Sequence, residues 1–465
     1  METAPKVKVA SKKYLLVYLI VSAMTFPLFV LADSAGISVL LFMVIQFAFL
    51  YRWVKPLIFI PFFIFGVNSF ISANTMWRVP NFFVAILLYS ATALWIKGQL
   101  PLKGSLLEFI FRTFKNILQP IYHFNMPAKW FFESRGTNVG IIKRVVIGVA
   151  ISAPCLIFLL IMLSRADAIF SHVVSDSLWW LVSLLHFTTI TRVIFGIVIG
   201  FYLFGMLVYI TRVSHEESEG RVIKEKRGDL LIINIVLVSI LIIYTLFVII
   251  QFRYLFASSD NLPFGLTFES YARRGFFELM ALTAINIALI LITCWLSKDQ
   301  RARLTKVLCF YLCAVTAVLL TSSFYRMWLH GSDDGLTRMR LLVFGFLIFK
   351  AIGILVTFVY ISRPNFNIVA IYCLIALIYY LSLNIIPIDN IVAHSQVNKY
   401  FASGRAGMHY ALTLSDDAAP QIARLLYSDN PYTSRGAEVF LASIGRPAGW
   451  RQWRISLWNY GFYTP

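Results

Sequence analysis

Two short polar segments carry most of the residues that could bind an anion. They are "FRYLFASSDNLPFGLTF" at 252–268 and "YRMWLHGSDDGLTRM" at 325–339. Each begins with an aromatic residue and an arginine, passes through Ser-Asp, and reaches Gly-Leu-Thr. Guanidinium groups bind carboxylates and phosphates through two parallel hydrogen bonds, so these arginines are candidate anion ligands. The similarity indicates either two parallel helical hairpins with equivalent loops or two unrelated polar loops.

The candidate ligand-binding residues are six arginines: Arg253, Arg273, Arg274, Arg326, Arg338 and Arg340. The same loops contain four acidic residues: Asp260, Glu269, Asp333 and Asp334. Two interpretations follow from this composition. The arginines pair with the acids and tie the loops shut, or the surplus cations face an anionic lipid headgroup, a cell-wall phosphate or a solute. Both interpretations can hold at once.

Acid–base or metal chemistry is a weaker alternative for the second segment. His330, Asp333 and Asp334 could act as acid and base or bind a metal, although a histidine beside a turn acid is usually a solvated surface residue. The sequence has no G-x-S-x-G, H-E-x-x-H, phosphate-binding loop or dinucleotide fingerprint. We therefore predict no catalytic residue, no metal site and no cofactor.

The elements that must position these loops are membrane helices. The chain has 465 residues, of which 59% are hydrophobic and 14% are charged. Apolar runs of about 20 residues match the length needed to cross a hydrocarbon layer. The sequence predicts an all-α, polytopic bundle with spans near 14–32, 36–51, 56–73, 79–96, 145–163, 191–211, 230–251, 276–296, 307–323, 341–361 and 368–386.

The distribution of positive charge predicts the orientation. Lys6, Lys8, Lys12 and Lys13 precede the first span, which places the N-terminus in the cytoplasm. An odd number of spans then sends the C-terminal tail outside. Most of the net charge of +19 falls on the cytoplasmic face, which indicates topology and affinity for anionic lipid rather than nucleic-acid binding. The basic residues of the short outer loops are all arginine.

The spans divide the chain into four predicted domains: a four-span bundle (1–96), a cytoplasmic interfacial loop (97–144), a seven-span core (145–386) and an extracytoplasmic tail (387–465). Within the loop, Glu108, Arg112 and Lys115 have the spacing of a helix lying in the membrane interface. The tail predicts three helices and a cap at Ser415 or Asp416, the helices lying near 391–403, 417–427 and 435–444.

Two charged residues fall within the predicted spans. Lys350 is central in its span, where a lysine costs roughly 2.5–3.5 kcal/mol, so it should face the bundle interior and a partner. Glu278 is the one acid within any predicted span. We expect an intramembrane Glu278–Lys350 pair that acts as an interhelical clasp or, alternatively, as a proton- or ion-coupling element.

Three segments resemble the hallmarks of a family of bacterial multi-pass membrane proteins known only as a domain of unknown function. They are "SYARRGFFELM" (270–280), "FYRMWLHGSDDGLTRMRL" (324–341) and "HSQVNKYFASGRAGMHYALTLSDDAAP" (394–420). The resemblance covers about 230–420, and the earlier spans resemble the family in layout alone. It implies the bacterial inner membrane and an extracytoplasmic tail, and it implies no known chemistry.

The leading functional hypothesis is an integral membrane protein of the bacterial envelope. Its arginine-rich outer loops and tail would engage an anionic lipid, a cell-wall component or a partner protein. One alternative is a transporter for a small solute or lipid, built on the parallel hairpins. A second alternative is an extracytoplasmic membrane enzyme.

Overall fold

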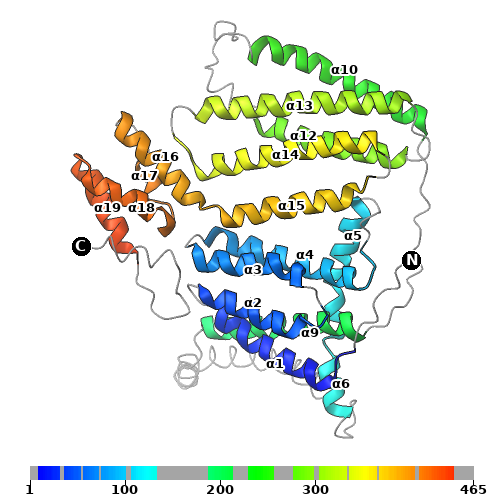
Figure 1. Ribbon diagram of the computed structural model, residues 1–465, viewed down its shortest axis with the longest axis vertical. Coiled ribbons are helices and arrows are strands. Elements are labelled where there is room, and N and C mark those ends of the chain that lie inside the picture. Colours follow the sequence, from blue (N-terminus) through cyan, green and yellow to red (C-terminus); the bar gives the residue numbers. More distant parts are fainter. Residues whose placement is uncertain are drawn as a thin grey trace, which may run out of the picture. The chain divides into compact units, whose positions relative to one another are not determined.

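The fold is entirely helical wherever the structure describes it (Figure 1). The computed structural model describes residues 9–31, 36–53, 56–72, 75–100, 106–133, 187–212, 229–255, 276–297, 303–331, 335–363, 366–403 and 408–444. Across these ranges every regular element is an α-helix or a short 3-10 helix.

Ten of the eleven predicted spans coincide with helices. These are α1 (Lys12–Phe29), α2 (Ile37–Leu50), α3 (Pro56–Ile71), α4 (Arg78–Ile96), α9 (Phe187–Arg212), α10 (Leu230–Leu255), α12 (Phe276–Leu296), α13 (Arg303–Gly331), α14 (Arg338–Ser362) and α15 (Ile368–Ile385). The predicted span at 145–163 lies outside the described residues. Eight of the helices are long and apolar enough to cross a membrane, and α2 and α3 have shorter apolar stretches. The chain is therefore a multi-pass, all-α membrane protein, as its hydropathy predicts.

The helix α13 is longer than the sequence predicts. It continues from the expected end at residue 323 to Gly331, so the first half of the charged stretch 325–340 is helical. No glycine or proline interrupts the sequence between these two points, and nothing local stops the helix earlier.

The described residues belong to two compact units. The first unit contains Met1–Gly66, Phe82–Leu100 and Arg112–His215, and the second contains Val67–Asn81, Pro101–Phe111 and Glu216–Pro465. Their boundaries differ from those of the four predicted domains, and that fourfold division stays a prediction.

Small residues bring α1 and α9 of the first unit into close contact. An added Cβ at Gly196 would lie 2.6 Å from the Ala23 carbonyl oxygen, and one at Gly200 would lie 2.7 Å from the Ala23 Cβ. Glycines four residues apart let two membrane helices approach backbone to backbone, which replaces the hydrophobic driving force that lipid does not supply. Either glycine replaced by a larger residue would force the two helices apart.

The predicted interfacial helix is present as α5 (Leu106–Ile117). Its polar face packs against protein: Asn116 Nδ2 donates to the Ser90 carbonyl over 3.0 Å, and Ser90 Oγ donates to the Thr113 carbonyl over 2.8 Å. Its aromatic side chains point outward, with Phe111 70% and Phe114 57% exposed. An exposed aromatic face on an amphipathic helix suits the boundary between headgroups and acyl chains.

In the second unit α13 is the central helix of a bundle. It packs against α10, α12 and α14, while α15 packs along α14. Leu237, Ile290, Leu312 and Leu347 form the core of this bundle, and each is essentially inaccessible to solvent.

The C-terminal part of the second unit folds as a helical module, named here the C-terminal module (residues 388–444). It consists of α16 (Ile388–Ser403), α17 (Met408–Ala411), α18 (Ala419–Ile422), α19 (Pro431–Ser443) and two 3-10 turns (Asp416–Ala418 and Ala423–Tyr427). Its own apolar core contains Val392, Val397, Ile422, Leu425 and Ala437. The three predicted tail helices are confirmed in outline, although the last begins at Pro431, where Asn430 caps it.

Candidate functional site

A charged contact joins the start of α14 to the start of α16 (Figure 1). The Arg338 guanidinium donates two hydrogen bonds to the Asp389 carboxylate, one from Nε to Oδ1 and one from Nη2 to Oδ2 over 2.6 Å. The Asp389 side chain is fully buried, whereas that of Arg338 is 29% exposed. This is the two-point geometry that arginine forms and lysine cannot.

Ser415 completes the surroundings of the Asp389 carboxylate. Its backbone N–H donates to Oδ2 over 3.1 Å, and its hydroxyl donates to the same oxygen. Burial alone would raise the pKa of Asp389, but the hydrogen bonds from Arg338 and Ser415 outweigh burial and hold the pKa below its ordinary value. The carboxylate also lies in the first turn of α16, where the helix dipole favours negative charge.

Backbone contacts hold the rest of the 335–340 loop against the module. Gln396 Nε2 donates to the Leu336 carbonyl over 2.8 Å, and the Leu336 N–H donates to Ser395 Oγ over 3.3 Å. The Arg338 N–H donates to the Tyr410 hydroxyl over 2.9 Å. We call residues 335–340 and these module residues the clasp.

Gly335 permits the clasp to close. Its φ of +79° lies in the left-handed region, and a Cβ there would come within 3.0 Å of the Gln396 amide. Its carbonyl accepts a hydrogen bond of 2.6 Å from Arg340 Nη1. A side chain at this position would strain the backbone and displace Gln396.

A hydrogen-bonded group of side chains covers one face of the module. This polar face consists of Asn390, His394, Asn398, Gln421 and Arg424. Asn398 Nδ2 lies 2.9 Å from His394 Nε2, and His394 Nδ1 lies 3.2 Å from Gln421 Oε1. Arg424 Nη1 donates to Asn398 Oδ1 over 2.8 Å and to Gln421 Oε1 over 3.2 Å. The five side chains include a cation and no carboxylate, and they come from two separate helical segments.

Lys350 is buried in the middle of α14, at 5% exposure. Its ammonium group donates to the Met280 carbonyl and, over 2.9 Å, to Thr283 Oγ1. It also lies 4.8 Å from the centre of the Phe346 ring. Glu278, on the same helix as Met280, is exposed. The helix predicted to supply the partner is thus α12, but its contributions to Lys350 are neutral oxygens, and the structure does not place the Glu278 carboxylate on the ammonium group.

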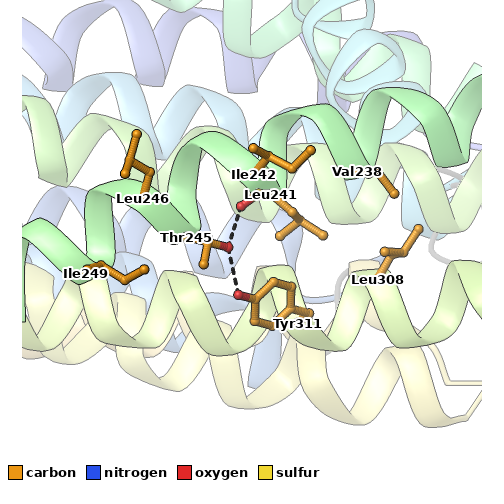
Figure 2. Close-up of a pocket in the computed structure, with 8 residues that line it drawn as sticks. All are labelled: Val238, Leu241, Ile242, Thr245, Leu246, Ile249, Leu308 and Tyr311. Carbon is orange, nitrogen blue, oxygen red and sulfur yellow. Dashed lines mark hydrogen bonds between the residues drawn. The ribbon is translucent and has the colours of Figure 1, made fainter.

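An outward-facing apolar groove of about 400 Å³ runs between α10 and α13 (Figure 2). Its polar atoms are paired, because Thr245 Oγ1 lies 2.6 Å from the Leu241 carbonyl and 2.7 Å from the Tyr311 hydroxyl. The remaining lining is aliphatic: Val238, Ile242, Leu246, Ile249 and Leu308. A groove of this composition suits contact with lipid chains and contains no ionisable group apart from the tyrosine.

Comparison with known protein families matches residues 59–425 to a domain of unknown function, DUF4153. The chain belongs to the DUF4153 family. Comparisons with curated proteins and with solved structures give no match. The DUF4153 match begins well before residue 230, so the resemblance seen in three motifs extends through most of the membrane helices. It also ends within the C-terminal module, and it therefore includes both sides of the clasp.

Among the six candidate arginines of this DUF4153 protein, the structure describes the side chains of two. Arg338 pairs with Asp389, and Arg340 bonds to the Gly335 carbonyl. Arg253 and Arg326 lie in helices, but their side chains are outside the described set, and Arg273 and Arg274 are outside it entirely. The candidate acid–base residues and the four loop acids (His330, Asp260, Glu269, Asp333 and Asp334) are also outside this set. The predicted similarity of the two loops therefore stays a prediction.

Several contributing residues escaped the sequence analysis. Asp389 was not considered as a partner because it follows α15, 51 residues beyond Arg338. The helical spacing of His394 and Asn398 could have indicated a shared face. Within the described part of the chain, no group of three or more His, Cys, Asp or Glu side chains could hold a metal ion.

A further buried cation lies where α4 ends. Lys97 is 6% exposed, and its ammonium group lies 3.4 Å from the centre of the Tyr209 ring. Burial lowers the pKa of Lys97 to about 8. His123 stacks on the same ring, and its pKa is lowered first by burial and then by the charge of Lys97. This cluster joins the 97–144 segment to α9 and has the character of a packing contact.

Proposed function

We propose that this protein is an envelope membrane protein of the bacterial inner membrane whose C-terminal module binds an anionic envelope component outside the cytoplasm. The ligand class is glycerol phosphate, as present in phosphatidylglycerol headgroups or in poly(glycerol phosphate) chains. The observation that carries the proposal is the polar face, which gathers a guanidinium, an imidazole and three amides without a carboxylate.

The composition of the polar face suits a phosphate diester bordered by hydroxyl groups. Arg424 offers two-point hydrogen bonding to phosphate oxygens. The amides of Asn398 and Gln421 can donate to and accept from glycerol hydroxyls. Phe401 is half exposed and lies 5.9 Å from the Arg424 guanidinium, so it supports that side chain from one side.

The clasp supports the proposal because it fixes the module on the membrane helices. The buried Arg338–Asp389 pair, the Gln396 bond and the Tyr410 bond connect α14 to three segments of the module. A binding surface whose side chains are already ordered loses less entropy when a ligand arrives. The clasp also neutralises an arginine at the helix end that we assign to the outer side.

The experiment uses the full-length protein in phosphatidylcholine nanodiscs, with two probes. Phosphatidylglycerol vesicles test a lipid source, and soluble poly(glycerol phosphate) tests a polymer source. We expect saturable binding of at least one probe. Arg424→Gln should weaken that binding about tenfold or more, since a hydrogen bond to a charged group contributes roughly 1.5–3 kcal/mol.

Arg435→Gln provides the matched control. Arg435 is an exposed arginine on α19 of the same module and lies outside the polar face, so its removal changes net charge equally. Equal losses in the two variants would indicate unspecific charge attraction and would contradict the proposal. Failure of the wild-type protein to bind either probe would also contradict it.

A further inference from the structure

A buried ammonium group in the membrane helices lacks an anionic partner among its contacts. Lys350 stands in the middle of a 25-residue helix, and its hydrogen bonds go to the Met280 carbonyl and to Thr283. Thr283 Oγ1 in turn donates to the Met280 carbonyl over 2.8 Å, so both of its lone-pair and proton roles are used locally. Three neutral groups therefore surround a full positive charge.

Neutral contacts of this kind leave much of the cost of burial uncompensated. A charged side chain in a membrane span normally pairs with an opposite charge or lines a water-filled cavity. An ammonium group also has three N–H bonds, of which the contacts with Met280 and Thr283 use two. One donor and one charge remain available to a ligand.

A second donor lies on the same face of α12. Asn286 follows Thr283 by three residues and is 1% exposed. Its Oδ1 accepts a hydrogen bond of 2.7 Å from the Tyr244 hydroxyl, whereas its Nδ2 has no hydrogen-bond partner in the described structure. A buried amide without a partner costs about 1–3 kcal/mol, so its retention calls for an acceptor.

We propose that Lys350, Thr283 and Asn286 form an intramembrane binding site for a small monovalent anion. An anion would supply the missing charge for Lys350 and the missing acceptor for Asn286. The three side chains are almost fully buried, which favours a halide-sized ion over an organic carboxylate. This site is separate from the polar face, and neither proposal depends on the other.

Bromide is a suitable probe, with gluconate replacing it at constant ionic strength. The melting temperature of the wild-type protein in nanodiscs should rise with bromide and saturate. The expected rise is about 3–6 °C when bromide exceeds its dissociation constant tenfold. Lys350→Met should remove the rise, and Asn286→Leu should raise the dissociation constant about tenfold.

Lys306→Met is the matched control, because Lys306 is a partly exposed lysine near the start of α13 in the same unit. This variant should keep the full bromide dependence. A wild-type melting temperature that is independent of bromide would overturn the proposal, as would an undiminished rise in Lys350→Met. Should Lys350→Met fail to fold, Asn286→Leu decides the matter, and an unchanged dissociation constant in it would overturn the site.

Discussion

Two cations on α14 are held in opposite ways. Arg338 begins the helix and shares its charge with the buried carboxylate of Asp389, while Lys350 in the middle contacts neutral oxygens. Arginine matches a carboxylate through two parallel bonds, and its partner is contributed by a different part of the chain. Lysine is a point charge that accepts any oxygen within reach.

The difference shows what each position contributes. At the helix end, pairing makes a rigid connection between the membrane helices and the C-terminal module. In the middle, the unpaired ammonium group lends little to stability and leaves a charge available for a ligand. Substitutions at the two positions should therefore have effects of different size, which the following predictions measure.

The largest effect is expected from Asp389→Asn. The change removes the buried charge that holds Arg338 and weakens both Ser415 bonds, and breaking one side of a buried pair costs about 3–5 kcal/mol. Native-state proteolysis of the full-length protein should show the module becoming susceptible while the membrane helices remain protected. A module as resistant as that of the wild-type protein would show that the pair does not secure it.

A smaller effect is expected from Gly335→Ala. The positive φ costs about 1–2 kcal/mol, and the new Cβ would also displace the Gln396 amide from the Leu336 carbonyl. Gly98→Ala is the control, because Gly98 also has a positive φ but has no neighbouring atom within 4 Å of an added Cβ. The excess loss of stability in Gly335→Ala, measured by thermal melting, reports the Gln396 contact. Equal losses would contradict that contact.

The pH dependence of the module is a third measure of the clasp. Because the pKa of Asp389 is lowered by folding, its contribution to stability is fully present above its ordinary value of about 3.8 and is lost as the pH falls through the folded value. Protease resistance of the wild-type module should decline below about pH 4. Asp389→Asn should lack that part of the decline, and parallel pH profiles would argue against the assignment.

The smallest effect is expected from Lys350→Met in the absence of a bound anion. The substitution removes a charge that has neutral partners and retains the length of the side chain, so the free energy of unfolding should change by about 1 kcal/mol or less. Thermal melting in gluconate provides the measurement. A loss comparable to that of Asp389→Asn would show that Lys350 is part of an essential ion pair.

Local features of the sequence predicted the membrane helices well, because hydropathy over a span is a property of adjacent residues. The same features identified Arg338 and Lys350 as residues that need partners. They did not identify Asp389 or Met280, since a partner is set by how distant helices pack. The predicted Glu278–Lys350 pair has the right helix and a different atom: a turn of α12 separates the carboxylate from the oxygens that Lys350 contacts.

Packing by small residues shows a similar limit. The Gly196 and Gly200 spacing is readable in the sequence as a helix contact motif, but the partner segment around Ala23 is not. The polar face likewise depends on two helical segments meeting, and half of it could be anticipated from the spacing on α16 alone.

The side of the membrane on which the module lies tests the account most directly. Tyr432 of the module and Tyr122 of the 97–144 segment are 90% and 72% exposed, so a cysteine at either position is accessible to reagents. In intact cells, a membrane-impermeant maleimide should label Tyr432→Cys, and it should label Tyr122→Cys only after the membrane is opened. Labelling of Tyr122→Cys in intact cells with protection of Tyr432→Cys would place the module in the cytoplasm and contradict the proposed function.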